Sequence, residues 1–167
     1  MDLTPYVAWI VFIHVAAAFV FAAGHGVSMY VAFQLRRETD RGRMLALLDI
    51  SGFSLVAAGI ALLVLLVAGI LAGIVLQSFG RTWIWVSLVL LVVIGGLMTP
   101  IGGAYFTRVR QALGQKTRGM KSEDPDPVPA SDAALAAMLA SRAPEQLLVL
   151  GGGGFLVILW LMMFKPF

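Results

Sequence analysis

The two histidines are the side chains of this sequence that can take part in the most kinds of chemistry, and both lie in its first apolar stretch. His14 and His25 are eleven residues apart, about three turns of an α-helix, so the two imidazoles face the same side. About 16 Å of helix axis separates them, so they cannot share one metal ion. Imidazole can ligate haem iron or copper, or carry a proton. Each histidine therefore defines a separate candidate site.

A single histidine needs a second ligand from elsewhere in the chain. Methionine is the available sulfur donor, because the sequence contains no cysteine. Met98 is the candidate partner of His25, and Met162 or Met163 is that of His14. Histidine with methionine suits b-type haem, and thioethers also favour Cu(I), so copper is the alternative cofactor. The structural alternative is a methionine that fills space and a histidine that hydrogen-bonds to a carbonyl or a serine hydroxyl.

Glycine is the second informative residue type. Gly24, Gly95 and Gly152 come from three different apolar stretches and belong to the half predicted to hold His25. Glycine in a membrane helix lets another backbone, or a flat ring, come close. The run from Gly151 to Gly154 also weakens helix propensity by about 1 kcal/mol per residue relative to alanine. A slot for a planar cofactor is the functional interpretation, and tight helix packing is the structural one.

The elements that must position these residues are membrane helices. The chain has 167 residues, of which 60% are hydrophobic and 13% charged, a composition typical of an integral membrane protein. Four apolar stretches approach or exceed the roughly 20 residues that span a bilayer. They are residues 6–35, 44–77, 83–105 and 146–164. Backbone groups in hydrocarbon must be satisfied internally, so the predicted fold is an all-α bundle of four transmembrane helices in a single domain.

Basic residues predict the orientation of this bundle. Segments 36–43 and 106–145 carry ten of the twelve lysines and arginines. The positive-inside rule then places both segments in the cytoplasm and both termini outside it, in a bacterial cytoplasmic (inner) membrane. The lipid bilayer is the expected environment, and the positive charge does not indicate nucleic-acid binding. Within the second segment we expect a short helix from Ala133 to about Ser141, on the membrane surface or on the mouth of the bundle.

Two residues inside the predicted spans are unusual for hydrocarbon. Asp49 is their only acid and is close in sequence to the arginines of segment 36–43, so an ion pair with them is expected at the membrane edge. A proton relay from Asp49 towards His25 is the alternative. Pro100 is expected to bend the third helix.

The stretch His14-Val-Ala-Ala-Ala-Phe-Val-Phe-Ala-Ala-Gly24 resembles the first helix of a family of bacterial four-helix integral membrane proteins of unknown function. More distantly it is similar to the membrane domain of copper-resistance D proteins and to the four-helix membrane protoporphyrinogen oxidase. The resemblance implies a metal or haem role for His14. Phe21 stands where the motif has tryptophan, and Ala23 replaces the first of two glycines. The predicted spans also lack the intramembrane lysines of the oxidase, so its activity is not implied.

Three functions remain open. The first is a b-type haem protein that supports electron transfer, as a homo-oligomer or as a subunit of a larger membrane complex. The second is a non-catalytic membrane subunit or scaffold that packs through its glycines. The third is a small copper or proton pathway that uses His14, His25, Ser28 and Met29. Motifs of zinc proteases, serine hydrolases and nucleotide-binding loops are missing, so no specific enzymatic reaction is predicted.

Overall fold

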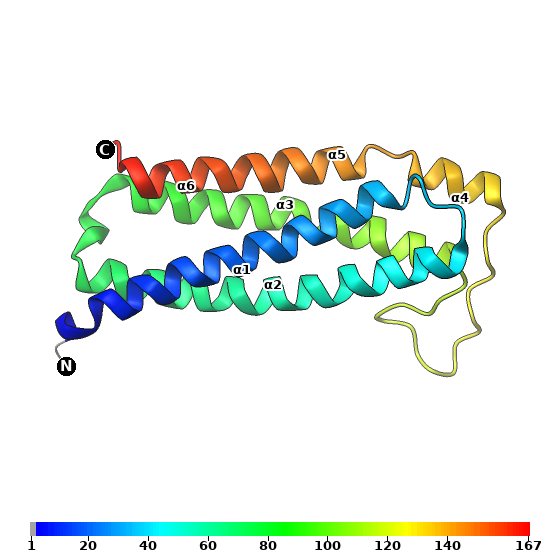
Figure 1. Ribbon diagram of the computed structural model, residues 1–167, viewed down its shortest axis with the longest axis horizontal. Helices are drawn as coiled ribbons and strands as arrows, with labels where there is room; N and C mark the ends of the chain where they lie inside the picture. Colours follow the sequence, from blue (N-terminus) through cyan, green and yellow to red (C-terminus); the bar gives the residue numbers. More distant parts are fainter. Residues whose placement is uncertain (1–2) are drawn as a thin grey trace.

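The computed structural model describes residues 3–167, and their regular secondary structure is entirely helical. The all-helical prediction is therefore confirmed for this part of the chain. Four helical segments are long and apolar enough to cross a membrane. They are Thr4–Gln34, Arg41–Val75, Thr82–Ala112 and Asp132–Phe164. The segments run side by side, and the two chain ends lie at the same end of the bundle (Figure 1).

The first two segments form a closely packed hairpin. A short turn of 3₁₀-helix, η1 (Thr4–Tyr6), leads into α1 (Val7–Gln34), and α2 is Arg41–Val75. The Asp40 carboxylate begins α2 by accepting a hydrogen bond of 2.8 Å from the backbone N–H of Arg43, which satisfies one free donor of the first turn. Small side chains allow the close approach of the two helices. Those buried here include Ala17, Gly24, Ser28, Ser51, Ser54, Ala58, Ala61, Ala68 and Gly73.

The third helix is longer than the apolar stretch from which it was predicted. After the 3₁₀ turn η2 (Ser78–Gly80), α3 runs from Thr82 to Ala112, beyond the predicted end at residue 105. Pro100 lies inside α3 without ending it. The extension carries basic residues on a helix instead of in a loop, because apolar side chains such as Val109 bury their surface at this end.

The fourth segment is four consecutive pieces and not one helix. The loop helix α4 is Asp132–Leu139, begun by Ser131, whose hydroxyl accepts from the Ala134 N–H at 3.3 Å. After a break come α5 (Ala143–Leu147), the π-helical element η3 (Leu148–Gly153) and α6 (Gly154–Phe164), which follow one another directly. The predicted span 146–164 therefore begins earlier and contains a stretch of wider helix.

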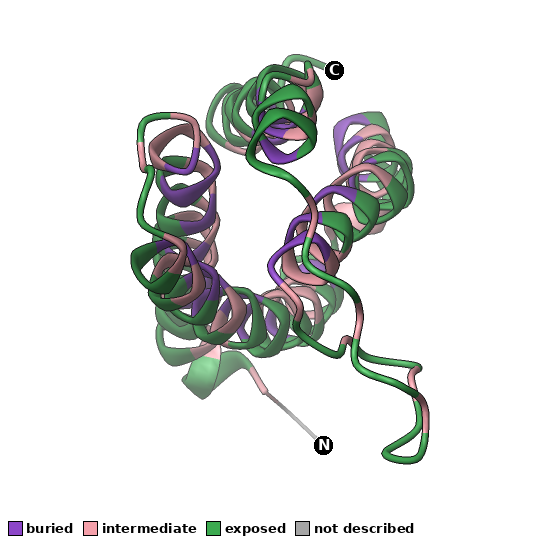
Figure 2. Ribbon diagram, turned by 90° about the vertical axis from the view of Figure 1, so that its right-hand side faces the viewer, coloured by how far each residue is buried: buried purple, intermediate pink, exposed green. Residues whose placement is uncertain are grey.

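The principal cluster of buried residues lies at one end of the bundle, which we name the basic end: segment 35–44, the C-terminal part of α3, and α4. The cluster consists of Val31, Ala32, Leu35, Met44, Leu48, Tyr105, Val109, Ala112, Leu113, Leu135 and Leu139. Leu135 and Leu139 are the apolar side of α4, so this helix covers the mouth of the bundle. Elsewhere the buried residues face inwards and the outer surface is exposed (Figure 2). In each membrane-length segment only a small fraction of residues is buried within the chain.

Asp49 forms its ion pair with a different partner from the one expected. Arg110 of α3 lies 2.9 Å from the Asp49 carboxylate, and the predicted partners in segment 36–43 do not contact it. The reason is the extension of α3, which brings Arg110 next to α2. Arg36 and Arg41 are instead bound to Glu145 and Asp132.

Candidate cofactor site

Gly151 of η3 lies next to both His25 and Met98. A Cβ atom placed on Gly151 would lie 2.6 Å from Met98 Cε, 3.0 Å from Met98 Sδ and 3.9 Å from His25 Cδ2. The thioether of α3 and the imidazole of α1 therefore border the same glycine, and a side chain at this position would require Met98 to move. The histidine and methionine that the sequence pairs as candidate ligands thus share one neighbour in the structure.

The wide helix at this point is part of the site. Gly151 belongs to η3, whose π-helical turns contain one more residue than α-helical turns. Such turns are costly in most sequences and often occur at functional sites. Three consecutive glycines in η3 give the backbone the freedom to adopt it, and the side chain of Met98 occupies the space next to Gly151.

The rest of the His25 environment is aromatic. The ring of Phe21 is 4.9 Å from that of His25 between centroids, and Phe155 of α6 is 6.5 Å from Phe21. His25 is half-buried. Over residues 3–167 no hydrogen bond is formed by its ring nitrogens, so both remain available for a ligand or a proton.

The serines expected as possible hydrogen-bond partners of His25 bond to one another instead. The hydroxyl groups of Ser28 and Ser51 are 2.7 Å apart, and the Ser54 hydroxyl donates to the Ser51 carbonyl at 2.9 Å. These bonds satisfy polar groups at the contact of α1 with α2. They leave the His25 imidazole as the uncommitted polar side chain of this region.

His14 is held differently from His25. Its Nδ1 donates to the Leu65 carbonyl of α2 at 2.9 Å, since a carbonyl can only accept. A Cβ on Gly69 would lie 2.8 Å from His14 Cε1, so the ring rests directly on the α2 backbone. His14 therefore joins α1 to α2, which is the structural alternative considered above. Its suggested partners are on α6, where Met163 is 71% exposed.

The three glycines predicted to form a slot do not meet. A Cβ on Gly24 would lie 2.7 Å from the Ser54 carbonyl oxygen, which makes Gly24 a contact between α1 and α2. A Cβ on Gly95 would have no neighbour within 4 Å, and one on Gly152 would have only Leu148. The glycine that borders both His25 and Met98 is Gly151. Gly151 is the first residue of the glycine run in the sequence, but Gly152 was selected for the predicted slot.

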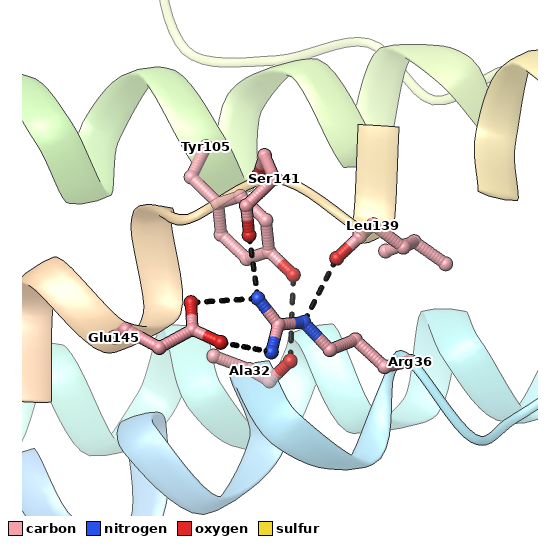
Figure 3. Close-up of polar contacts among 6 residues, drawn as sticks. All are labelled: Ala32, Arg36, Tyr105, Leu139, Ser141 and Glu145. Carbon is pink, nitrogen blue, oxygen red and sulfur yellow. Dashed lines mark hydrogen bonds and ion pairs between the residues drawn. The ribbon is translucent and has the colours of Figure 1, made fainter. Parts of the chain in front are cut away.

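At the basic end, Arg36 forms hydrogen bonds with several groups of the fourth segment (Figure 3). Its Nε donates to the Leu139 carbonyl at 3.0 Å, and one terminal nitrogen donates to the Ser141 carbonyl at 2.5 Å. Both terminal nitrogens bind the Glu145 carboxylate. The hydrogen bond to Glu145 raises the pKa of Arg36 above its ordinary value, so its charge persists at any accessible pH.

The described residues hold no group of three or more histidine, aspartate, glutamate or cysteine side chains that could bind a metal ion. The histidine–methionine pair is thus the arrangement with the clearest ligand chemistry. Comparison of the chain with models of protein families, with curated proteins and with solved structures finds no match.

Proposed function

We propose that this protein binds b-type haem, or a similar tetrapyrrole, at the His25–Met98 pair and supports electron transfer within a membrane. The observation that carries the proposal is the unpaired His25 imidazole, which borders Gly151 together with the Met98 thioether. Imidazole and thioether are an axial pair of haem iron, and methionine ligation raises the reduction potential. His14 is not assigned as a ligand, because its ring is bound to α2.

The chain's own residues fit this role in two further ways. Phe21 supplies flat apolar surface beside the imidazole, Phe155 extends that surface from Phe21, and a low-polarity surrounding tunes the potential of a haem. The glycines of η3 let a planar ring approach the backbone, and Gly152 and Gly153 are exposed.

An absorption spectrum tests the proposal directly. Protein purified from a bacterial membrane, with haem supplied during expression, should show a Soret band and the visible bands of six-coordinate, low-spin iron. The control is the same preparation of the protein with both His25 and Met98 replaced by leucine. Absence of a Soret band in the unaltered protein would overturn the haem assignment.

Copper is the second candidate, and the donor types of the two side chains favour it. The thioether and the imidazole that border Gly151 are soft and borderline donors of the kind that Cu(I) prefers. A single ion also needs less space than a porphyrin. Metal analysis of the same preparation separates the candidates: copper in place of iron assigns the pair to Cu(I). If neither binds, a non-catalytic subunit remains.

We also propose that lipid and further protein subunits cover this chain, as a homo-oligomer or within a larger membrane complex. Support comes from the low burial of the four membrane-length segments. Gly95, Gly96 and Gly103 of α3 are exposed with open space around them, and exposed glycines permit close helix contact in lipid.

The proposed orientation has both termini outside the cytoplasm of a bacterial inner membrane. Because the chain has no cysteine, single cysteines report on topology without background. Ser78→Cys, in η2, should react with a membrane-impermeant maleimide in intact spheroplasts. Glu123→Cys, in the long loop, should react only after permeabilisation. The reverse labelling pattern would invert the assigned orientation.

A further inference from the structure

Arg36 is the most heavily hydrogen-bonded side chain at the basic end, and the hydrogen bonds of its guanidinium all go to the fourth segment. Both of its terminal nitrogens donate to Glu145, and the carbonyls of Leu139, at the end of α4, and Ser141, in the break, accept the remaining bonds. A guanidinium paired in this two-pronged way with a carboxylate fixes direction as well as distance. The end of α1 therefore holds the start of α5 in one position.

The residue that Arg36 binds belongs to the same continuous helical stretch as Gly151 of the candidate cofactor site. Glu145 lies in α5, and α5, η3 and α6 form one uninterrupted helical rod from Ala143 to Phe164. Gly151, in the same rod, borders His25 and Met98. His25 lies in α1, and Arg36 lies in the turn just after α1 ends at Gln34. This stretch of chain is thus next to the rod at two places, because Arg36 binds Glu145 and His25 borders Gly151.

The contact at the cofactor site cannot set its own alignment with α1. Gly151 is followed by Gly152, Gly153 and Gly154, so this part of the rod has no side chain that could interlock with His25. Specific side chains are what normally fix the register of packed helices. On the α1 side of the rod, the described residues supply the ring contact of Phe21 with Phe155 and the ion pair of Arg36 with Glu145, and only the ion pair is directional.

We propose that Arg36 and Glu145 are positioning residues that set the register of the α5–η3–α6 rod against α1, and so place Gly151 opposite His25. The importance of this register for a cofactor rests on the function proposed above. The register itself can be measured without any cofactor, so the two proposals fail independently.

Cross-linking measures the register. Phe21 of α1 and Phe155 of α6 are 6.5 Å apart between ring centroids, and the natural chain has no competing cysteine. In a variant with cysteines at both positions, a short bis-maleimide should join the two helices quickly. Arg36→Gln or Glu145→Gln should slow this reaction severalfold. The exchange of the two charges, Arg36→Glu with Glu145→Arg, should restore it.

Arg41 and Asp132 provide a matched control. Their ion pair of 2.7 Å also ties segment 35–44 to the fourth segment, but Asp132 lies in α4, which a break separates from the rod. Arg41→Gln should therefore leave the cross-linking rate unchanged. If Arg36→Gln also leaves it unchanged, or if Arg41→Gln slows it equally, the positioning role is overturned.

The same variants without added cysteines are then examined for bound cofactor. Arg36→Gln should alter the iron or copper spectrum at temperatures well below unfolding, because Gly151 then moves relative to His25 and Met98, and the charge exchange should reverse the effect. An altered cross-linking rate in a protein that binds neither cofactor would support the positioning role and overturn the cofactor assignment. An unaltered rate with an altered spectrum would overturn the positioning role.

Discussion

Replacement of His25 with leucine is expected to abolish the Soret band of the purified protein, or its bound copper if the ion is the cofactor. The imidazole is the stronger ligand of the pair, and no other histidine lies near Met98, since His14 is about 16 Å away along α1. Loss of an axial or chelating imidazole removes most of the binding free energy, so cofactor occupancy should fall at least tenfold, about 1.4 kcal/mol or more. The measurement is cofactor per protein after purification.

His14→Leu is the matched comparison for this experiment, because it changes the same residue type on the same side of the same helix. It should retain the cofactor and lose some stability instead, since the Leu65 carbonyl loses its hydrogen bond. Met98→Leu should keep the cofactor at reduced occupancy, with a five-coordinate, high-spin spectrum if the cofactor is haem. Retention of the cofactor in His25→Leu together with its loss in His14→Leu would contradict the assignment and favour the site implied by the family resemblance.

The sequence predicted much of this fold because membrane helices depend on properties that are local in the chain. Length and hydrophobicity decide whether a segment can span, and both are visible without any neighbour. The extension of α3 to Ala112 was missed because it depends on a tertiary contact, the burial of Val109 and Ala112 against α4 and α1. The partner of Asp49 was missed for the same reason, since Arg110 reaches it only on an extended helix.

The candidate site, too, was predicted from the sequence only in part. His25 and Met98 were paired from residue type and depth alone, and in the structure both border Gly151. Gly152 was selected from the run of four glycines, and the sequence alone does not show which of the four faces His25, because the π-helical turns of η3 depart from 3.6 residues per turn. The run of four glycines was the available signal of an irregular helix. The aromatic neighbours Phe21 and Phe155 belong to helices whose relative rotation the sequence does not specify.

Gly24 and Gly26 show how far the surroundings of a glycine decide its role. Both lie in α1, two residues apart, but Gly24 packs against α2 and Gly26 faces open space. A Cβ on Gly24 would come within 2.7 Å of the Ser54 carbonyl oxygen and 3.0 Å of Ala58 Cβ. A Cβ on Gly26 would meet nothing within 4 Å. The first contact is with backbone, which cannot rotate away, so any side chain at position 24 must push α1 from α2.

Gly24→Leu is therefore expected to destabilise the protein strongly, because it overpacks the interface that joins the first two helices. Overpacking of this kind costs about 1–3 kcal/mol, and separation of the serine contacts of Ser28 with Ser51 adds to it. Gly26→Leu adds the same side chain in open space and gains helix propensity of about 1 kcal/mol, so its stability should equal or exceed that of the natural chain. The measurement is the midpoint of thermal unfolding in one detergent for all three proteins. Equal midpoints for the two variants would show that α1 and α2 do not approach as closely at Gly24 as the structure requires.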